Sequence, residues 1–487
     1  MNEIFTTLNE YLGSIFFFDV FFGSVEGASM PFIVAWLIAG GVFLTLRFGF
    51  INIRMFAHAY KILIGKYKTA DDRGEISPFQ SLTTALSATV GLGNIAGVAI
   101  AIAIGGPGAT FWMILAGFFG MTLKFTEVTL AQIYREQRPD GRIMGGAMQY
   151  LSKGLAARGY QKLGRVLAIL FAFLAIGGSL GAGNAFQTSQ AMGALTERIP
   201  FLEHYPIVFG IIMAALVGFV IIGGIKRIAH TAEKIVPLMV FVYLMASLWI
   251  LIDHASLVPH AITTIFKEAF APTAAVGGLV GVLVQGFKRA AFSSEAGIGS
   301  AAIVHSTASV KYPVRQGLVA LYEPFIDTIV ICTMTALVIV TTGVYAADGE
   351  FANLVASKQG AALTAAAYGT VISWFPVILS FSIVLFAFST MISWSYYGER
   401  SWTYIFGEKY TLIYKLIFVS FTVIASITSA STLLDFSDLL ILGMALPNLI
   451  GLYVMHTEVK ENLKAYIKKW KSGELDRECI AKEVCEI

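Results

Sequence analysis

The chain has 487 residues and a formal net charge of +3, and 56% of its residues are hydrophobic while only 13% are charged. A soluble globular domain carries about 25% charged residues, so this composition excludes an ordinary soluble protein. Apolar stretches of about 20 residues, each long enough to cross a hydrocarbon core of about 30 Å, recur along nearly the whole chain. The sequence therefore predicts an all-α protein that crosses the lipid bilayer many times.

The first 27 residues are predicted to lie at the membrane surface, because polar residues interrupt their aromatic-rich apolar run. They lack a basic region and a small-residue cleavage site, so no removable signal peptide is predicted. Eleven membrane-spanning helices are expected at residues 28–47, 80–104, 108–134, 164–192, 206–225, 229–252, 273–306, 316–343, 370–394, 411–430 and 434–456. Residues 255–270 and 351–367 are predicted as short helices on the outer face.

The distribution of Lys and Arg orients these helices. With the N-terminus outside, 28 of the 34 basic residues fall in the predicted cytoplasmic segments, and the outward loops hold only Arg198, Lys267 and Lys358. Misplacing one helix would invert every later loop and remove this asymmetry. The sequence therefore predicts an odd number of spans in the inner membrane and a cytoplasmic tail at residues 457–487.

Two of the predicted spans carry the same glycine motif. Residues 88–96 read ATVGLGNIA and residues 294–302 read SEAGIGSAA, so both contain small–x–x–Gly–aliphatic–Gly–polar in one register. Five helices separate the two starts, so one span points outward and the other inward. This pattern is expected of an inverted five-plus-five repeat.

The glycines indicate that both helices are broken at membrane depth. Glycine costs about 1 kcal/mol relative to alanine in a helix and lets the backbone unwind. Unwound backbone inside a membrane persists only where it is buried in protein or lines a cavity, where freed amides can bind a carboxylate and freed carbonyls can coordinate Na⁺. Close helix packing is the alternative, since similar glycine spacing is common in membrane helices. The matched pair favours a binding site.

Longer stretches resemble the alanine-or-glycine:cation symporter family. The resemblance covers roughly residues 30–455, and it is carried by residues 77–80, 93–99, 105–113, 183–184 with Gln187, 222–228, 292–293 with 295–297, 327–328 with 332–333, 394–399 and 447–448. Leu92 and Ser294 depart from the family, where Thr and Asn are usual, and Ala147 and Gln149 depart where Pro and an aromatic are common. Leu92 adds bulk near the expected pocket and leaves open which side chain the pocket accepts.

The resemblance implies a leucine-transporter-like fold and sodium-coupled, or sometimes proton-coupled, import of small neutral amino acids, mainly alanine or glycine. By this analogy residues 77–252 form the first repeat and 273–456 the second, and the helix at 28–47 is an addition. No organic cofactor and no nucleic-acid partner is expected, and the oligomeric state is left open.

Residues of the two breaks are the candidates for binding substrate. The backbone of Gly91, Leu92 and Gly93 is expected to hold the carboxylate, with Gly297 across from it. Two polar side chains have alternative roles: Asn94 either contributes an oxygen or bonds freed backbone groups, and Gln187 either faces the cavity or bonds between helices. Aromatic residues that would wall or close the pocket, unless they are plain packing, are Phe292 and Trp394.

A sodium site is expected where the first break faces a later helix. By resemblance to the site shared across this fold, the carbonyls of Ser87 and Val90 would meet the hydroxyls of Ser389 and Thr390. The alternative is that these hydroxyls bond only to their own helix.

Ionisable residues inside predicted spans are costly and often functional. Glu295 is expected to pair with Arg289 or Lys288, and the alternative is that it binds a proton or cation. His305 is predicted to be a capping or interfacial residue. Rival functions are a proton-coupled carrier of another small solute, a passive channel, and a membrane-embedded enzyme, which is disfavoured because no catalytic triad, zinc motif or phosphate-binding loop occurs.

Overall fold

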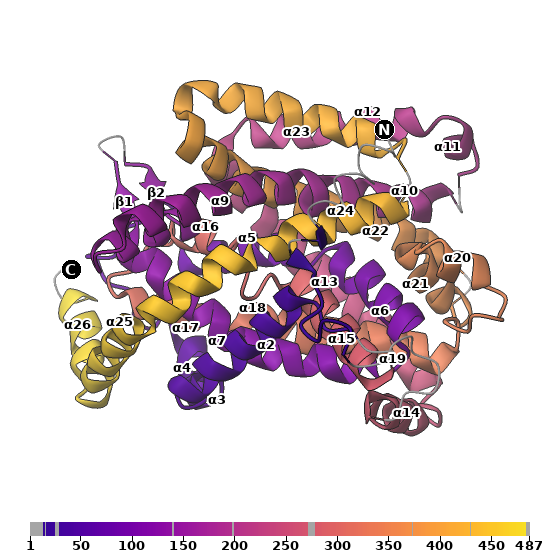
Figure 1. Ribbon diagram of the computed structural model, residues 1–487, viewed down its shortest axis with the longest axis horizontal. Helices are drawn as coiled ribbons and strands as arrows, with labels where there is room; N and C mark the ends of the chain where they lie inside the picture. The colour runs from indigo at the N-terminus through magenta and orange to yellow at the C-terminus, as the bar shows by residue number, and fades with distance from the viewer. Residues whose placement is uncertain are drawn as a thin grey trace.

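The computed structural model describes residues 13–14, 16–24, 29–138, 141–196, 199–270, 278–372, 374–428 and 430–483. These residues are mostly helical (Figure 1), and the sheet among them is a short antiparallel pairing of β1 (Glu136–Gln137) with β2 (Ile143–Met144). Most of the predicted interfacial segment at 1–27 lies outside the described ranges.

The first half of the chain contains three interruptions of π-helical geometry, η1 to η3, within otherwise α-helical segments. Its helices are α2 (Phe32–Arg47), α3 (Ile51–Arg54), α4 (Phe56–Leu63), α5 (Pro78–Thr89), η1 (Gly93–Gly97), α6 (Val98–Gly105), α7 (Ala109–Tyr134), α8 (Ala147–Gln149), η2 (Tyr150–Gly154), α9 (Gln161–Leu180), η3 (Gly181–Ala185), α10 (Phe186–Thr196), α11 (Phe201–His204), α12 (Pro206–Ile221), α13 (Gly224–Asp253) and α14 (Val258–Phe270).

The second half repeats the alternation of long and interrupted helices. Its helices are α15 (Gly278–Ser294), α16 (Ala302–His305), α17 (Pro313–Val319), α18 (Tyr322–Pro324), η4 (Phe325–Cys332), α19 (Thr333–Thr342), α20 (Ala352–Ala356), α21 (Gly360–Gly369), α22 (Phe375–Phe406), η5 (Glu408–Tyr410), α23 (Thr411–Ala425), α24 (Ala430–Gly443), α25 (Ala445–Lys471) and α26 (Glu474–Glu483).

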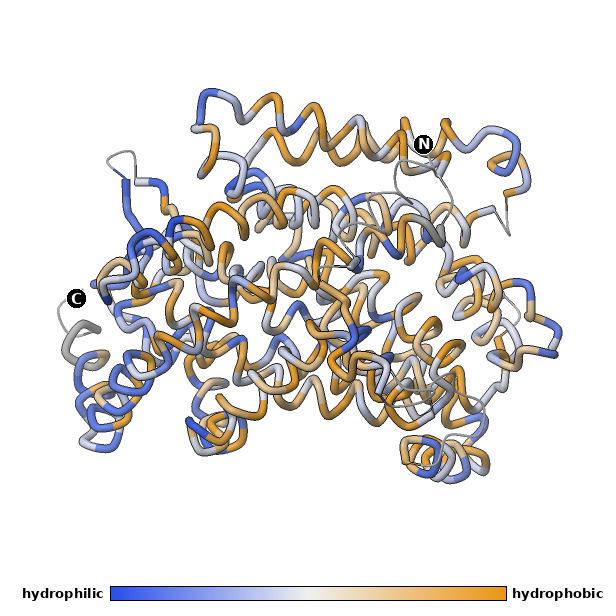
Figure 2. Tube along the Cα trace, viewed as in Figure 1, coloured by the Kyte–Doolittle hydropathy of each residue, from blue (hydrophilic) through white to orange (hydrophobic). Residues whose placement is uncertain are grey.

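The molecule has the polarity of a protein that crosses a membrane several times. Hydrophilic residues gather at its two ends, near α26 and the β1–β2 pair on the left and near α20 on the right, and hydrophobic residues dominate between them (Figures 1 and 2). Within the described residues, six helices are long and apolar enough to span a bilayer, and a seventh span is formed if the bent pair α5–α6 counts as one.

Each of the eleven predicted spans coincides with a helix or a group of helices. The elements α2, α12, α15 and α23 are shorter than the six long spans, so the count of eleven stays a prediction. The last predicted span is longer than expected, because α25 continues to Lys471 and ends before Gly473, which has a left-handed φ of 71°. The first part of the predicted tail therefore extends the last helix.

The segment predicted as an outer-face helix at 351–367 is buried in its second part. Gly360 of α21 lies directly against the backbone of Ala96, and the Thr364 hydroxyl donates to the Ile95 carbonyl at 3.0 Å. Sequence alone missed this insertion because α21 is short and apolar on all sides, as a buried helix is. The prediction of 255–270 as a short helix is confirmed by α14.

Small residues bring the helices of the scaffold close together. α7 packs against α2, α15 and α17, while α22 packs against α9 and α13. A Cβ on Gly286 of α15 would lie 2.6 Å from the Ala109 carbonyl oxygen of α7, so this crossing requires glycine. α12 and α23 lie side by side at the upper edge of Figure 1.

A buried group of charges joins α15 to α24. Asp438 accepts from Lys288 Nζ at 2.8 Å and also forms an ion pair with Arg289, and both Arg289 and Asp438 are only 2% exposed. The prediction that Glu295 pairs with Arg289 or Lys288 is therefore wrong. Both cations lie on the regular part of α15 and point to α24, whereas Glu295 follows the end of that helix.

We expect Asp438→Asn to destabilise the protein by about 3–5 kcal/mol, because it leaves buried cations without their carboxylate. Thermal unfolding of the detergent-solubilised variant measures the loss. The matched control is Asp435→Asn on the same helix, where the exposed ion pair with Lys358 (3.5 Å) should be worth less than about 1 kcal/mol. Equal stability of the two variants would contradict a structural role for the buried pair.

Candidate functional site

The first glycine motif breaks a helix, as predicted. A capping box begins α5, with the Ser77 hydroxyl accepting from the Gln80 amide at 3.1 Å, and α5 ends at Thr89. The chain resumes helical geometry in η1 at Gly93, and the two parts are bent by 50° relative to each other. The Val90 amide still donates to the Leu86 carbonyl at 2.7 Å, whereas the Gly91 amide turns to the Thr89 carbonyl at 2.8 Å, so regular helical bonding stops after Val90.

Two side chains bond the freed amides. Asn94 Oδ1 accepts from the Gly91 amide at 3.0 Å, and Gln187 Oε1 accepts from the Leu92 amide at 3.2 Å. Gln187 reaches this point because η3 distorts the helix before α10, and its own amide donates to the Ala182 carbonyl at 3.0 Å. In this arrangement Asn94 bonds freed backbone, which is one of its two predicted roles, and Gln187 touches the stretch expected to hold a carboxylate.

The second motif also interrupts its helix, but with a different backbone. α15 ends at Ser294, and Glu295, Gly297 and Gly299 all have φ between 55° and 89° before α16 begins. Glycine adopts this left-handed region readily, whereas Glu295 is held in it at a cost of about 1 kcal/mol or more. The Gly297 carbonyl accepts from Asn448 Nδ2 at 2.8 Å, so α25 fixes the break.

The two breaks meet each other directly. A Cβ on Gly93 would lie 3.1 Å from Ser293 Cα, so only a glycine lets the chains approach this closely without displacement. Asp327 of η4 joins them, because its Oδ1 accepts from Asn94 Nδ2 at 2.6 Å and its Oδ2 accepts from the Ser293 hydroxyl at 3.0 Å. All of these residues are buried.

Asp327 is a site residue whose role sequence reasoning missed. It is an ionisable residue in the apolar span predicted at 316–343, but nothing in its own segment indicates which elements it contacts. The hydroxyl of the next residue, Thr328, also donates to Oδ2 of Asp327 at 2.7 Å. A carboxylate that receives donors from both breaks can stabilise their closed arrangement.

The predicted sodium ligands lie together at the end of α5. Thr390 Oγ1 of α22 donates to the Ser87 carbonyl at 3.1 Å, and the Ser87 hydroxyl donates to the Ser389 carbonyl at 2.7 Å. The Ser389 hydroxyl instead donates to Phe386 in its own helix at 2.9 Å. Val90 caps the end of α5 one turn beyond Ser87. Two of the four predicted oxygens, the Ser87 carbonyl and the Thr390 hydroxyl, therefore meet, while the Ser389 hydroxyl takes the alternative of bonding to its own helix.

The two candidate aromatic residues pack against the elements that carry the site. Trp394 of α22 is 1% exposed and lies against Gly183 of η3, where a side chain would overlap the indole. It also lies within hydrogen-bonding reach of the Glu295 carboxyl. Phe292 packs edge-on against Phe186 of α10, with ring centroids 5.0 Å apart. Both residues therefore border the breaks, and both are also packing residues.

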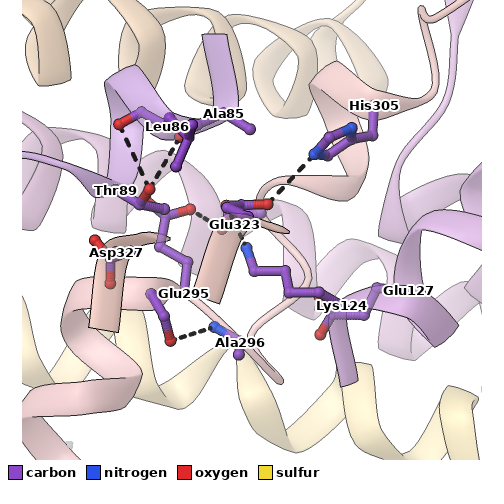
Figure 3. Close-up of polar contacts among 12 residues, drawn as sticks. Ala85, Leu86, Thr89, Lys124, Glu127, Glu295, Ala296, His305, Glu323 and Asp327 are labelled. Carbon is purple, nitrogen blue, oxygen red and sulfur yellow. Dashed lines mark hydrogen bonds and ion pairs between the residues drawn. The ribbon is translucent and has the colours of Figure 1, made fainter. Parts of the chain in front are cut away.

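A second group of buried charges lies beside the breaks (Figure 3). Lys124 Nζ of α7 is 2.9 Å from Glu323 Oε1, and Glu323 Oε2 is 3.3 Å from His305 Nε2. The prediction that His305 is a capping or interfacial residue is wrong. Its side chain is fully buried, because α16 packs against α5 and α7. The partner of Glu295 is the Ser300 hydroxyl, which donates to its carboxylate, and not the predicted Arg289 or Lys288.

Two cavities lie toward opposite ends of the molecule. One, of about 710 Å³, is lined by Glu75, Arg142, Lys226, Glu399 and Arg400 among others. The other, of about 350 Å³, is lined by uncharged polar groups that include Ser189, Thr196, Ser357, Gln359, Ser426 and Thr428. The residues of both breaks are themselves buried.

Arg135, just beyond α7, fastens the segments around the larger cavity. Its guanidinium donates to the Ser306 carbonyl at 3.0 Å and to the Arg73 carbonyl at 2.7 Å. Burial lowers the pKa of this guanidinium to about 10, which leaves it charged at neutral pH. It therefore ties the chain before α5 to the chain after α16.

Comparison with known proteins agrees with this architecture. The chain is 39% identical over 437 residues to the sodium/alanine symporter AgcS of Methanococcus maripaludis, covering 90% of this chain and 94% of that protein. It is 33% identical over 447 residues to the probable sodium/glutamine symporter GlnT of Bacillus subtilis, covering 91% and 89%.

A solved structure shares the fold. The crystal structure of MhsT in complex with L-phenylalanine matches with a TM-score of 0.52 and 14% identity, over 80% of this chain and 99% of that chain. The predicted leucine-transporter-like fold is thereby confirmed. Residues 17–480 match the sodium:alanine symporter family, whose members are transporters and not enzymes. On this match and these identities, the chain belongs to the sodium:alanine symporter family.

Proposed function

We propose that the protein imports a small neutral amino acid together with Na⁺ by alternating access. The observation that carries this proposal is the meeting of two helix breaks at Gly93 and Ser293, beside the oxygens of Ser87 and Thr390 and between two polar cavities. Relatives named as sodium/alanine and sodium/glutamine symporters support the substrate class. Alanine or glycine is the default substrate.

The substrate carboxylate would bind at the amides of Gly91, Leu92 and Gly93. In the closed structure Asn94 and Gln187 supply acceptors to two of the amides in this stretch. A carboxylate can replace the Gln187 oxygen at no loss of hydrogen bonds and with gain from its charge, since charge-assisted bonds are roughly twice as strong as neutral ones. The displaced Gln187 amide is then free to contact the ligand.

Sodium would bind between α5 and α22. When the ion lies between Thr390 Oγ1 and the Ser87 carbonyl, both oxygens become ligands and the hydrogen bond between them is lost. The ion then joins the cytoplasmic half of the first broken helix to the scaffold. Sodium and substrate would thus stabilise the same closed arrangement, which couples the two binding events.

We propose that the end with α26, the β1–β2 pair and the larger cavity faces the cytoplasm, in line with the basic residues there. The N-terminus would then lie outside and the C-terminus inside. Movement of α5 and α16 away from the scaffold would open the larger cavity to the site, and movement of α21 would open the smaller one.

Uptake into right-side-out membrane vesicles tests the proposal. We expect alanine or glycine to accumulate against its gradient when Na⁺ is higher outside, and competition among amino acids to define the range of side chains. Accumulation that persists without a sodium or proton gradient would refute coupled transport. Dependence on external pH with no dependence on Na⁺ would favour the proton-coupled alternative, and flux without accumulation would favour a channel.

We expect Gly93→Ala to lower the uptake rate by about 10-fold or more, because the added methyl pushes the two breaks apart by overpacking. The protein should still reach the membrane, which immunoblotting of the membrane fraction measures. Gly97→Ala is the matched control in the same π-helical turn, where the nearest atom to a new Cβ lies 4.0 Å away. Normal uptake by Gly93→Ala would contradict the assignment of this break to the site.

We expect Thr390→Val to raise the sodium concentration for half-maximal uptake by about 10-fold, equivalent to about 1.4 kcal/mol, since valine keeps the shape and removes the oxygen. Ser382→Ala, which removes an exposed hydroxyl bonded only to its own helix α22, is the control and should leave sodium dependence unchanged. An unaltered sodium dependence in Thr390→Val would place the ion elsewhere.

A further inference from the structure

Five buried polar residues form a cluster at the cytoplasmic side of the proposed site. Ser81, Lys124, His305, Gln316 and Glu323 are each fully buried, and they come from α5, α7, α16, α17 and α18 respectively. The cluster thus contains a residue from the cytoplasmic half of each broken helix and three residues from the helices around them. We call it the His305 cluster.

The Nε2 atom of the His305 ring faces the carboxylate of Glu323, which is also paired with Lys124. Glu323 accepts from Lys124 through Oε1 at 2.9 Å, and its Oε2 lies 3.3 Å from His305 Nε2 (Figure 3). A carboxylate only accepts hydrogen bonds, so Nε2 carries a hydrogen and donates it. This contact fixes the orientation of the ring.

The second ring nitrogen of His305, Nδ1, carries no hydrogen. His305 Nδ1 lies 2.7 Å from Gln316 Nε2, and an amide nitrogen can only donate. Nδ1 is therefore an acceptor, and it also receives the Ser81 hydroxyl at 3.1 Å. With the Gln316 amide in this orientation the ring is neutral, and the single Nδ1 lone pair is shared between Gln316 and the Ser81 hydroxyl of the α5 half-helix.

The Gln316 side chain can also serve a His305 ring that carries a hydrogen on Nδ1. Its Oε1 is buried and has no hydrogen-bond partner among the described residues. A half-turn of the amide would place Oε1 against Nδ1 and give a protonated ring the acceptor it needs. The two orientations of this amide thus correspond to two protonation states of His305.

Ionisable side chains on α7, α18 and α22 lie around His305. Glu323 from α18 and Lys124 from α7 face it, and Lys124 also interacts electrostatically with Glu127 and Glu295. From α22, Tyr397 interacts with Glu323 and Glu295, and α5 carries no ionisable side chain. A protonated His305 would share the Glu323 carboxylate with Lys124.

We propose that His305 is a proton-binding site that controls the opening of the transporter toward the cytoplasm. When Nδ1 takes up a proton it donates to Gln316 Oε1, and Ser81 loses its acceptor. The Ser81 hydroxyl is left with the Val304 carbonyl at 3.4 Å, a weaker contact. The α5 half-helix is then released from α16, so cytoplasmic acid favours inward opening. This inference rests on the proposed function for its orientation and its consequence for transport.

The proton site itself is tested without transport. Nitrogen-15 NMR of the full-length protein in detergent, with labelled histidine, shows whether each ring nitrogen carries a hydrogen, and the His305 signal is identified by its loss in His305→Gln. We expect Nδ1 of His305 to be unprotonated at about pH 8 and to become protonated within the range of about pH 5 to 8. A ring that stays neutral throughout this range would overturn the proposal.

Gln316→Met distinguishes a proton site from a merely packed histidine and keeps the histidine in place. Removing the accepting oxygen should lower the proton affinity of His305 by about tenfold, which moves its titration midpoint down by about one pH unit. An unchanged midpoint would show that the amide does not respond to the proton. This comparison also serves if His305→Gln fails to fold, because Gln316→Met and Ser81→Ala both shift the wild-type His305 signal.

The consequence for transport is read in membrane vesicles with a fixed sodium gradient and a clamped internal pH. We expect wild-type uptake to be several-fold faster at about pH 6 inside than at about pH 8, and Ser81→Ala to be fast at both, since it lacks the bond that the proton removes. His230→Gln, at an exposed cytoplasmic site, should behave as wild type.

The two proposals fail in different ways. Sodium-dependent uptake that ignores internal pH in the wild type would overturn the role of His305 and leave the proposed function intact. If the wild type and all variants lack sodium-dependent uptake while the NMR titration of His305 is as expected, the proposed function is overturned and the proton site stands. Uptake by Ser81→Ala that keeps the wild-type pH dependence would show that α5 is not held through this bond.

Discussion

Backbone amides and carbonyls that leave a helix inside a membrane must find partners within the protein, because hydrocarbon offers none. Each break in this chain meets that demand with side chains, some from its own segment and some from distant elements. The Gly91 amide bonds Asn94, the Leu92 amide bonds Gln187 of α10, and the Gly297 carbonyl bonds Asn448 of α25. The positions of α10 and α25 are thus fixed by the breaks, and a ligand that supplies an oxygen can replace a side chain without leaving any backbone group unpaired.

The buried charges divide into two sets with different roles. Asp438 with Lys288 and Arg289 joins α15 to α24 along regular helix, away from both breaks, so it supports packing. The set around Lys124 and Glu323 reaches both half-helices through His305. A buried ion pair is weak evidence for stability, because desolvation offsets much of its attraction. Its value here lies in geometry: the lysine holds one oxygen of Glu323 so that the other faces the histidine ring.

Much of the fold follows from local sequence, and much of the site does not. Length, hydropathy and glycine spacing predict the spans and both breaks, since a glycine pair in an apolar run acts within a few residues. The partners of charged side chains depend on rotation about each helix axis. Glu295 was therefore paired with Arg289 by proximity in sequence, although its left-handed backbone turns it toward Ser300. Asp327, His305 and the buried α21 likewise depend on contacts between segments more than 100 residues apart along the chain, such as Asn94 with Asp327.

The two breaks share a sequence register and differ in chemistry. Gly91, Gly93 and Asn94 correspond to Gly297, Gly299 and Ser300, yet only the second set adopts left-handed conformations. Asn94 is long enough to bond the Gly91 amide three residues back, which keeps the first break in right-handed geometry. Ser300 is shorter and bonds Glu295, so the glycines open out and Asn448 of α25 bonds the Gly297 carbonyl. The first break is therefore held by side chains, while the second is also anchored to the scaffold by Asn448. In the proposed mechanism sodium and the proton act on the first half-helix, where Ser87 contacts α22 and Ser81 contacts α16.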